Sequence, residues 1–341
     1  MRVLDRLRAL RGRVILGGLA MSLAGPAAAQ TAVKFSLDSN FDGPSAPFVV
    51  GIDRGYYKAE GLDVSVEAAS ALDPVTRVAS GSYDMGVADI NALIRFRDQN
   101  PASPVKAVFM VYDRPPFAII ARKSRGIAAP KDLVGKKLGA PAADAAFAHW
   151  RIFARANGID LARATIENVG LAVREPMLAA GQLDAMIGAS FAFVDLKERG
   201  VPVDDIVVML MADYGVTLYG NAIIVNPKFA ADKPEAVRAF LRAFLRSLKE
   251  TVRNPSRAVD SVLKRNDLAK KEVEIERLRM AIRDNILTAE ARASGYGGVE
   301  AARLDGSIDQ IALAYTFKSK PKGADIFDAA FLPAASERRL D

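Results

Sequence analysis

The fold is decided by two stretches, VASGSYDMGVAD at residues 78–89 and LAAGQLDAMIGAS at residues 178–190. In each, an apolar segment ends at a glycine (Gly81, Gly181), and an aspartate three residues later (Asp84, Asp184) leads into small and apolar residues. A glycine in this place is typical of a helix C-terminus, and the run after it is typical of a buried strand. The repeat predicts two similar lobes. The alternative is that two ordinary helix-to-strand turns agree by chance.

Segments with helix and strand patterns alternate on both sides of these stretches. Apolar-periodic runs at 48–61 and 90–100, and another that ends at Gly158, are typical of helices. Strands are expected at 33–37, 62–69, 106–113, 117–123, 136–140, 165–170, 204–213 and 221–226. The alternation predicts βαβ units and an α/β fold with mainly parallel sheets flanked by helices. From Lys233 onward the pattern is mostly helical, which predicts a helical C-terminal region.

The first 29 residues resemble an export signal. A basic start that ends at Arg13 precedes an apolar run from Val14 to about Leu23, and small residues follow at Ala27 and Ala29. We expect cleavage after Ala29 and a periplasmic location. The apolar run is shorter than the roughly 20 residues of a membrane-spanning helix, and no later stretch is long enough, so no stable membrane insertion is expected. No cysteine is present to accept a lipid anchor.

The net charge and the chain length further narrow the possible classes of protein. Five arginines and one aspartate lie in the leader, so its removal lowers the formal net charge from +7 to +3. Charges of both signs are mixed along the remainder, which argues against a nucleic-acid partner. The remaining chain exceeds the roughly 250 to 300 residues at which single cores stop growing. We therefore expect two lobes, residues 30–117 with 218–341 and residues 118–217, in a monomer.

The residue types leave little material for catalysis. The chain has no cysteine and one histidine, His149, beside the sole tryptophan in FAHWRIF. The usual zinc sites and the Ser-His-Asp or Cys-His catalytic systems are built from cysteine and histidine side chains, of which this chain has almost none. The sequence therefore predicts no metal, no cofactor and no enzymatic activity, with His149 as a packing or surface residue.

A basic amphipathic pattern occupies residues 234–252. Its apolar positions share one helical face, and arginine and lysine lie opposite. Such a helix is able to bind membranes. We expect it instead to pack on its own lobe, because the apolar face continues the core pattern. The apolar residues are Val237, Phe240, Leu241, Phe244, Leu245, Leu248 and Val252.

The segment LDSNFDGPSAPFVVGIDRGYYKAEGLDVSVE, residues 37–67, resembles the opening of NMT1-like and sulfonate/nitrate/taurine-type periplasmic binding proteins. Its landmarks are Asp38, Gly55, Tyr56, Tyr57, Glu60, Gly61, Leu62, Asp63 and Val64. The likeness continues through residues 78–89, 114–144 and 175–188 to IFDAAFLP at 326–333. It implies a type II two-lobed fold, a small-molecule solute held between the lobes, and an ABC permease as partner.

The chain departs from two branches of this family. The thiamine-pyrimidine branch carries Trp, Asn and His after the strand-end aspartate, where this chain has Ser39, Asp42 and Ser45. A fungal branch makes the pyrimidine from its own histidine and uses a cysteine-rich segment, which is absent here. These departures argue against a pyrimidine precursor as first choice and against the fungal enzyme activity.

Ligands of open α/β sheets bind outside the carboxyl ends of the strands, where loops and helix N-termini converge. This rule selects residues from both lobes and both crossings as ligand-binding candidates. They are Asp38, Ser39, Asn40, Phe41, Asp89, Asn91, Tyr112, Asp144, Arg174, Glu175, Ser190, Phe191, Tyr214, Tyr219 and Asn221. The alternative for Asp144 and Ser190 is a helix N-cap, and for the aromatic residues it is the core.

Arg174 leads us to expect an anionic ligand. A guanidinium binds a carboxylate or sulfonate through two parallel hydrogen bonds, and Arg174 precedes an expected helix start. The alternative is an internal pair with Glu175 or another acid. We therefore expect a solute-binding protein for a small organic anion, with a neutral pyrimidine-like solute as second choice. A sensory partner or a carboxylate-based enzyme of the same fold are the alternatives from other classes.

Overall fold

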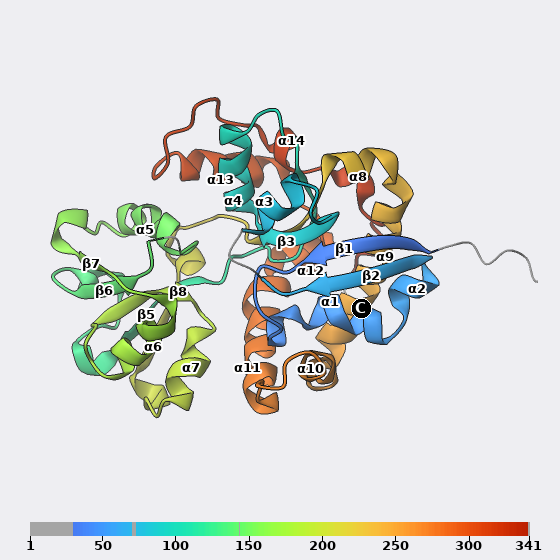
Figure 1. Ribbon diagram of the computed structural model, residues 1–341. Coiled ribbons are helices and arrows are strands. Elements are labelled where there is room, and N and C mark those ends of the chain that lie inside the picture. Colours follow the sequence, from blue (N-terminus) through green and yellow to red (C-terminus); the bar gives the residue numbers. More distant parts are fainter. Residues whose placement is uncertain (1–29, 70–72, 143, 340–341) are drawn as a thin grey trace, which may run out of the picture.

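The computed structural model describes residues 30–69, 73–142 and 144–339 (Figure 1). The expected signal peptide, residues 1–29, lies outside the described residues. The chain is an α/β protein with two five-stranded sheets, as the alternating pattern predicts. We call the part built around the first sheet lobe 1 and the part built around the second sheet lobe 2.

The sheet of lobe 1 has the order β2-β1-β3-β10-β4. Strands β1 and β2 pair in parallel, as do β1 and β3, whereas β10 runs antiparallel to both β3 and β4. Four strands therefore share one direction and the late-coming β10 opposes them. The bounds are β1 Thr31–Ser36, β2 Leu62–Glu67, β3 Met85–Asp89, β4 Lys106–Met110 and β10 Asn221–Val225.

The sheet of lobe 2 repeats this plan with the order β7-β6-β8-β5-β9. Here β6 is parallel to β7 and β8, and the reversed strand is β5, the first to enter the lobe. Its strands are β5 Phe117–Arg122, β6 Lys137–Ala140, β7 Thr165–Asn168, β8 Ala185–Ala189 and β9 Ile206–Leu210. We propose the two sheets as the cores of the predicted lobes, residues 30–117 with 218–341 and residues 118–217.

The repeated sequence stretches occupy equivalent places in the two sheets. Gly81 and Gly181 both have a left-handed backbone, with φ of 78° and 74°. The Asp84 carboxylate accepts a hydrogen bond from the Lys34 amide at 2.8 Å, and the Asp184 carboxylate accepts one from the Lys137 amide at 2.9 Å. Each aspartate thus ties the start of its strand to the neighbouring parallel strand. The internal repeat therefore has the same structural purpose in both lobes.

Helices cover both faces of each sheet (Figure 1). In lobe 1 the helices are α1 Ala46–Asp53, α2 Tyr56–Ala59, α3 Pro74–Ala79, α4 Ile90–Gln99, α8 Pro227–Asp232, α9 Pro234–Arg253, α10 Pro255–Leu263, α11 Lys271–Ala281, α12 Ala289–Ser294, α13 Ala301–Ile311 and α14 Gly323–Ile326. In lobe 2 they are α5 Trp150–Ala156, α6 Leu171–Ala179 and α7 Ala192–Glu198. The predicted helical C-terminal region is thus part of lobe 1.

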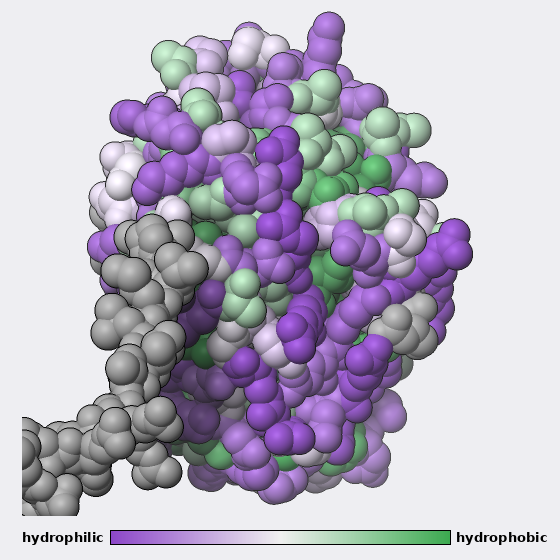
Figure 2. All heavy atoms as spheres, turned by 90° about the vertical axis from the view of Figure 1, so that its right-hand side faces the viewer, coloured by the Kyte–Doolittle hydropathy of each residue, from purple (hydrophilic) through white to green (hydrophobic). Residues whose placement is uncertain are grey.

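The amphipathic helix α9 packs on its own lobe. Phe240 stacks on Phe35 of β1 at a ring distance of 5.1 Å, and Phe244 stacks on Phe48 of α1 at 4.9 Å. Fully burying one such aromatic ring contributes roughly 1.5 to 3 kcal/mol. No helix in the described ranges is long and apolar enough to cross a membrane. The face of lobe 1 that points away from lobe 2 is mostly hydrophilic (Figure 2).

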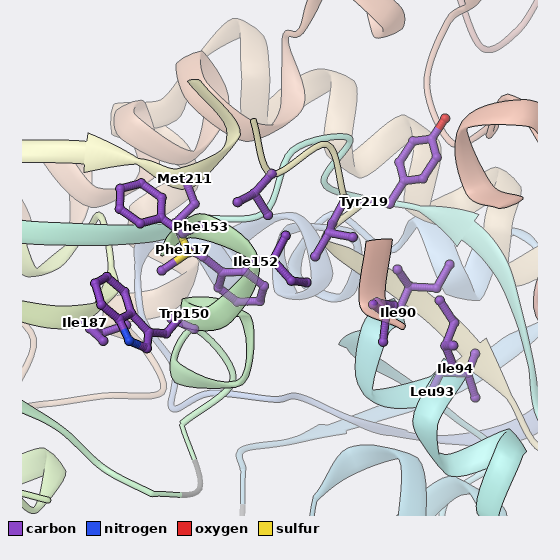
Figure 3. Close-up of a cluster of buried hydrophobic side chains, with 14 of the residues drawn as sticks. Ile90, Leu93, Ile94, Phe117, Trp150, Ile152, Phe153, Ile187, Met211 and Tyr219 are labelled. Carbon is purple, nitrogen blue, oxygen red and sulfur yellow. The ribbon is translucent and has the colours of Figure 1, made fainter. Parts of the chain in front are cut away.

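One hydrophobic core continues from lobe 1 into lobe 2. It runs from Ile90, Leu93 and Ile94 of α4 to Trp150 and Phe153 of α5 (Figure 3). The two chain crossings pass this core, and they approach each other closely at Gly220. A Cβ atom there would lie 2.9 Å from the Pro115 Cα atom, so only glycine fits without a shift. This packing places the carboxyl ends of strands from both sheets around a common cleft.

Candidate functional site

The main cavity lies between the two lobes and has a volume of about 700 Å³. Lobe 1 supplies the loop after β1, and lobe 2 supplies the starts of α6 and α7. The first turns of α11 form a further part of the wall. Its lining residues are Asp38, Ser39, Asn40, Phe41, Asp42, Ala69, Leu171, Ala172, Arg174, Glu175, Ala189, Phe191, Ala192, Asp195, Arg199, Asn266, Glu274 and Arg277. A cavity of this size suits a small organic ligand.

Two carboxyl groups define the wall of lobe 1. Asp38 directly follows the buried strand end, and its carboxylate accepts a hydrogen bond from the Asn221 side chain at 2.5 Å. Asp42 caps the short helical turn at Gly43–Ser45, accepting the Ser45 amide at 3.1 Å. Neither carboxyl group forms an ion pair with another described residue. Both therefore keep oxygen atoms available at the cavity.

The surroundings disfavour the charged forms of these two groups. Burial among protein atoms raises the pKa of Asp38 to about 6, and the nearby charge of Asp89 adds to the shift. Asp38 is an exposed residue at the cleft, but the protein atoms around its carboxyl make desolvation the largest cause of this shift. Burial also raises the pKa of Asp42 to about 7, and the charges of Asp38 and Glu274 raise it further. The site thus holds two carboxyls that titrate near neutral pH.

Five charged residues of the lining were not among the predicted ligand residues. They are Asp42, Asp195, Arg199, Glu274 and Arg277. Glu274 is buried on α11 and accepts the Gly43 amide at 2.6 Å, which places it beside Asp42. Arg277 binds Glu274 at 2.6 Å and also binds Asp195 of lobe 2 at 2.5 Å. Glu274 and Arg277 lie more than 200 residues from the Asp42 loop in the sequence. In the sequence, the only signal was the i, i+3 spacing of Glu274 and Arg277 on an expected helix.

On the lobe 2 wall, the charge of Arg174 is paired with acids of the same lobe. The Arg174 guanidinium donates to Glu175 at 3.1 and 2.7 Å, to Asp144 at 3.0 Å and to the Ile187 carbonyl at 2.9 Å. These bonds use four of its five N–H donors. The close approach to β8 requires Gly188, where a Cβ atom would lie 2.7 Å from the guanidinium. Arg174 is 6% exposed, so its main role in this structure is an internal ion-pair network.

The cavity as a whole carries more acids than bases. Its five acids exceed its three arginines, and two of those arginines are already bound to acids of the same lining. The acids are Asp38, Asp42, Glu175, Asp195 and Glu274, and the bases are Arg174, Arg199 and Arg277. A field of this sign disfavours an anion and favours a neutral hydrogen-bond donor or a cation.

A second cavity of about 570 Å³ adjoins the first. The two share Asn40, Phe41, Asp195, Asn266, Glu274 and Arg277, and the second extends along the segment that leads into α11. Behind Asp38 a small pocket of about 20 Å³ is lined by Tyr112 and Asn221, with room for about one water molecule. The cleft therefore consists of two large connected chambers and a small recess.

The predicted ligand residues lie in several different places in the structure. Asp38, Ser39, Asn40, Phe41, Arg174, Glu175 and Phe191 line the main cavity. Tyr112 and Asn221 line the small recess. Asp144 caps a turn by accepting the Ala146 amide at 2.7 Å and binds Arg174, so the capping alternative is observed together with an ion pair.

The remaining predicted residues lie at the crossings and line none of these cavities. The Asn91 side chain donates to Asp89 at 2.7 Å and to the Tyr219 carbonyl at 2.8 Å. Tyr219 is fully buried, and its hydroxyl binds Glu290. Tyr214 packs edge-on against Phe153, and Ser190 is buried. We therefore leave these five residues out of the proposed site.

His149 is a buried packing residue. Its ring stacks on Phe117 at 4.8 Å, and its Nδ1 atom lies 2.8 Å from the Ala145 carbonyl. Burial and the charge of Arg95 lower the pKa of His149 to about 3, so the imidazole is neutral at physiological pH. It lines none of the cavities described above. Within the described ranges, no cluster of three metal-ligating side chains occurs.

Three ion pairs join the lobes across the cleft. They link α7 of lobe 2 to α11 and the residue before it in lobe 1. Lys197 binds Glu276 at 2.5 Å, Glu198 binds Lys270 at 2.9 Å, and Asp195 binds Arg277 at 2.5 Å. The first two pairs are solvent-exposed, with 32 to 75% of each side chain accessible. They hold the lobes together on the side away from the crossings.

Comparison with known proteins identifies relatives with binding functions. The chain is 31% identical over 218 residues to the riboflavin-binding protein RibY of Chloroflexus aurantiacus, covering 63% of this chain and 61% of that protein. It therefore spans about three fifths of that relative's length. It is 27% identical over 241 residues to the formylaminopyrimidine-binding protein of Halalkalibacterium halodurans, covering 68% and 71%.

The expectation that the chain has no enzymatic activity is contradicted by another relative. The 4-amino-5-hydroxymethyl-2-methylpyrimidine phosphate synthase of Legionella pneumophila is 26% identical over 218 residues, covering 63% of this chain and 67% of that protein. Proteins named as enzymes therefore occur among its relatives. The expectation failed because it treated the missing cysteines and the single histidine as decisive, although a two-lobed cleft serves binding proteins and enzymes alike.

Solved structures confirm the fold. The periplasmic aliphatic sulphonate binding protein SsuA from Escherichia coli superimposes with a TM-score of 0.70 at 13% identity, covering 89% of this chain and 94% of that one. The periplasmic binding protein fold expected from the sequence is thus observed. The profile described as NMT1/THI5 like matches residues 43–258, more than half of the chain. The protein belongs to the NMT1/THI5-like family.

Proposed function

We propose that this protein is an exported solute-binding protein that captures an uncharged nitrogen heterocycle of the pyrimidine type and delivers it to an ABC permease. The observation that carries the proposal is the pair of carboxyl groups on the lobe 1 wall. Asp38 and Asp42 face the cavity and take part in none of the ion pairs of the described residues, and the charge of Arg277 only partly offsets the burial of Asp42. Carboxylate oxygens accept N–H donors, which heterocycles with ring or exocyclic amines supply.

Two aromatic side chains support a flat ligand. Phe41 belongs to the loop after β1, Phe191 follows β8, and both line the main cavity. They come from opposite lobes, so closure of the cleft brings them toward the two faces of a bound ring. Offset stacking on each ring contributes about 0.5 to 1.5 kcal/mol beyond area burial. The relatives named for riboflavin and formylaminopyrimidine both bind such rings.

This proposal replaces the organic anion that Arg174 led us to expect. The guanidinium already donates four hydrogen bonds to internal acceptors. An anion would have to displace Asp144 or Glu175, which are themselves largely buried. Separating such a pair costs several kcal/mol. The neutral ring, second choice from the sequence, therefore becomes first choice.

A thermal-shift assay of residues 30–341 tests the proposal. Pyrimidine bases and riboflavin are compared with taurine, aliphatic sulfonates and aromatic carboxylates. A ligand at a hundred times its Kd adds about 2.7 kcal/mol to stability. We expect this shift for a heterocycle in the wild type, and a loss of at least about tenfold in affinity in Asp38→Asn, equivalent to about 1.4 kcal/mol. Asp63→Asn, at an exposed position of β2, is the control.

Two outcomes of this assay decide between the alternatives. A shift with sulfonates or carboxylates and none with heterocycles would reject the proposed ligand class. Mass spectrometry of the recovered ligand distinguishes binding from conversion. An unchanged heterocycle supports delivery to a permease, whereas a chemically altered one would assign the cleft a synthase-type reaction.

A further inference from the structure

The two crossings between the lobes differ in stiffness. The first, residues 111–116, ends in Pro115 and Pro116, whose rings fix the backbone angle φ. The second, residues 211–220, contains Gly215 with a φ of 88°, and residues 216–220 form no helix or strand. The second crossing therefore absorbs a rotation of lobe 2 more easily than the first.

Side chains of α13 in lobe 1 hold this second crossing. The Arg303 guanidinium donates to the Leu218 carbonyl at 3.1 Å and to the Thr217 carbonyl at 3.3 Å. Gln310, about two turns further along α13, donates to the Gly215 carbonyl at 2.7 Å and accepts the Thr217 amide at 2.9 Å. Four backbone groups of a segment without regular structure are therefore bonded to one helix of lobe 1.

Arg303 also reaches the first crossing. Its guanidinium donates to the Asp113 carbonyl at 2.6 Å, so one side chain bonds the backbones of both crossings. Arg303 is held in this place by an ion pair with Glu290 of α12 and by the Tyr219 ring, whose centre lies 4.0 Å from the guanidinium carbon. The Glu290 carboxylate also accepts the Tyr219 hydroxyl. The Arg303 guanidinium therefore has a fixed position between the two crossings.

The first crossing has further bonds to lobe 1 that do not involve Arg303. The Asp113 amide donates to the Asn285 carbonyl at 3.0 Å, and the Asn285 side chain donates to the Arg114 carbonyl at 2.9 Å. The Thr288 hydroxyl binds the Asp113 carboxyl group. Loss of the Arg303 side chain therefore releases the second crossing more than the first.

We propose that Arg303 and Gln310 are positioning residues, which fix the second crossing and thereby favour the lobe arrangement in which α7 and α11 form their ion pairs. This inference rests on the proposed function, because it concerns how tightly the cleft holds its ligand. A ligand bound between the lobes contacts both walls, so its apparent Kd rises as the fraction of molecules in this arrangement falls. Neither residue lines a cavity of the cleft, so the effect reaches the ligand only through the positions of the lobes.

The lobe arrangement is measured without ligand. The chain has no cysteine, so Asp204→Cys in lobe 2 and Asp267→Cys in lobe 1, both at exposed positions, carry spin labels at these two places only. Double electron–electron resonance on residues 30–341 gives the distribution of distances between the labels. Arg303→Gln and Gln310→Ala should each at least about double the share of molecules with distances longer than the main wild-type peak.

Two control variants lie at exposed positions of the neighbouring helices. They are Arg292→Gln on α12 and Asp309→Ala on α13, and both should leave the distance distribution unchanged. Gln310→Ala removes only two hydrogen bonds, so it keeps the test decisive where Arg303→Gln fails to fold.

Ligand kinetics separate a positioning role from an ordinary stabilising contact. The probe is riboflavin, followed by its own fluorescence in a stopped-flow instrument, or the pyrimidine base selected by the thermal-shift assay, followed by protein fluorescence. In both variants the apparent Kd should rise at least about fivefold. Both rate constants should increase, the dissociation rate constant more strongly, because the ligand enters and leaves through the open arrangement.

The contrary outcomes are distinguishable. Unchanged distances and rate constants in a folded variant overturn the inference and leave the proposed function standing, and a loss of stability without these changes has the same meaning. Longer distances in the variants, with no heterocycle bound by the wild type, support the positioning role and overturn the proposed function.

Discussion

The two lobes share a fold but treat the charges on their cleft walls in opposite ways. The repeated glycine and aspartate positions, 81 and 84 in lobe 1 and 181 and 184 in lobe 2, make equivalent turns and hydrogen bonds. Lobe 2, however, encloses Arg174 between two acids, whereas the Asp38 and Asp42 carboxyls of lobe 1 take part in none of the ion pairs of the described residues. The difference is the basis of our proposal that the charges of lobe 2 are paired internally and that the carboxyls of lobe 1 bind the ligand.

The largest effect should follow from breaking the lobe 2 network. Arg174→Ala leaves Asp144 and Glu175 without their partner in a largely buried place, and should lower the free energy of unfolding by about 3 to 5 kcal/mol. Urea unfolding followed by circular dichroism measures this. Arg199→Ala, an exposed cavity arginine without an ion pair in the described chain, should change stability by less than about 0.5 kcal/mol. If Arg174→Ala has normal stability but no longer binds the ligand, Arg174 belongs to the ligand site.

A smaller effect should follow from neutralising the lobe 1 wall. The folded-state pKa of Asp42 is raised from 3.8 to about 7, so the folded protein holds this proton more tightly than the unfolded chain. Stability is therefore lost as pH rises from about 4 to 7. Asp42→Asn keeps a capping side chain but cannot bind or release this proton. Between pH 4 and 6, the free energy of unfolding should therefore fall by about 2 kcal/mol less in this variant than in the wild type.

Urea unfolding of Asp42→Asn at a series of pH values measures this change. The matched control is Asp73→Asn, which replaces another capping aspartate at an exposed helix start. A pH dependence identical to that of the wild type would show that the raised pKa of Asp42 does not cause the loss of stability.

Lobe 2 should respond to pH in the opposite direction. The pKa of His149 is lowered from 6.5 to about 3, so its stabilising contribution is complete above pH 6.5 and is lost as pH falls toward 3. Between pH 6.5 and 5 the loss should be about 1.5 kcal/mol. His149→Gln should remove this acid-side slope in the same unfolding experiment. An unchanged slope would contradict a neutral, desolvated imidazole.

The smallest effect concerns the ion pairs that join the lobes. Exposed pairs such as Lys197 with Glu276 contribute about 0.2 to 1 kcal/mol each and are screened by salt. Raising the salt concentration from 0.05 to 1 M should therefore increase the radius of gyration of the ligand-free protein, measured by small-angle scattering. Glu276→Gln should open the cleft at low salt, and Glu235→Gln on α9 should not. A salt-independent radius would show that these pairs do not control closure.

Local patterns predicted the fold well. Helix and strand periods, the glycine after each helix and the repeated stretch required no long-range information. The reversed directions of β5 and β10 were less visible, because strand direction depends on which sheet the chain enters at its two crossings. The export segment stays a prediction, since residues 1–29 are outside the described structure.

The site was only partly visible in the sequence. The rule that ligands bind beyond strand ends found Asp38 and Phe41, which line the cavity. It also selected Tyr219 and Asn91, because the rule does not tell which strand ends point toward the other lobe. Glu274 and Arg277 were missed because their position depends on how a distant helix packs. Arg174 was found, but its partners could not be read from its neighbours in the sequence.

The proposed role of Asp38 and Asp42 is tested most directly by a crystal structure of the wild-type protein with a bound heterocycle, using riboflavin or a pyrimidine base according to the thermal-shift result. We expect the ring to lie between Phe41 and Phe191, with its N–H groups toward Asp38 and Asp42 and the Arg174 ion pairs intact. A ligand bound through the Arg174 guanidinium, with Asp144 or Glu175 displaced, would contradict it.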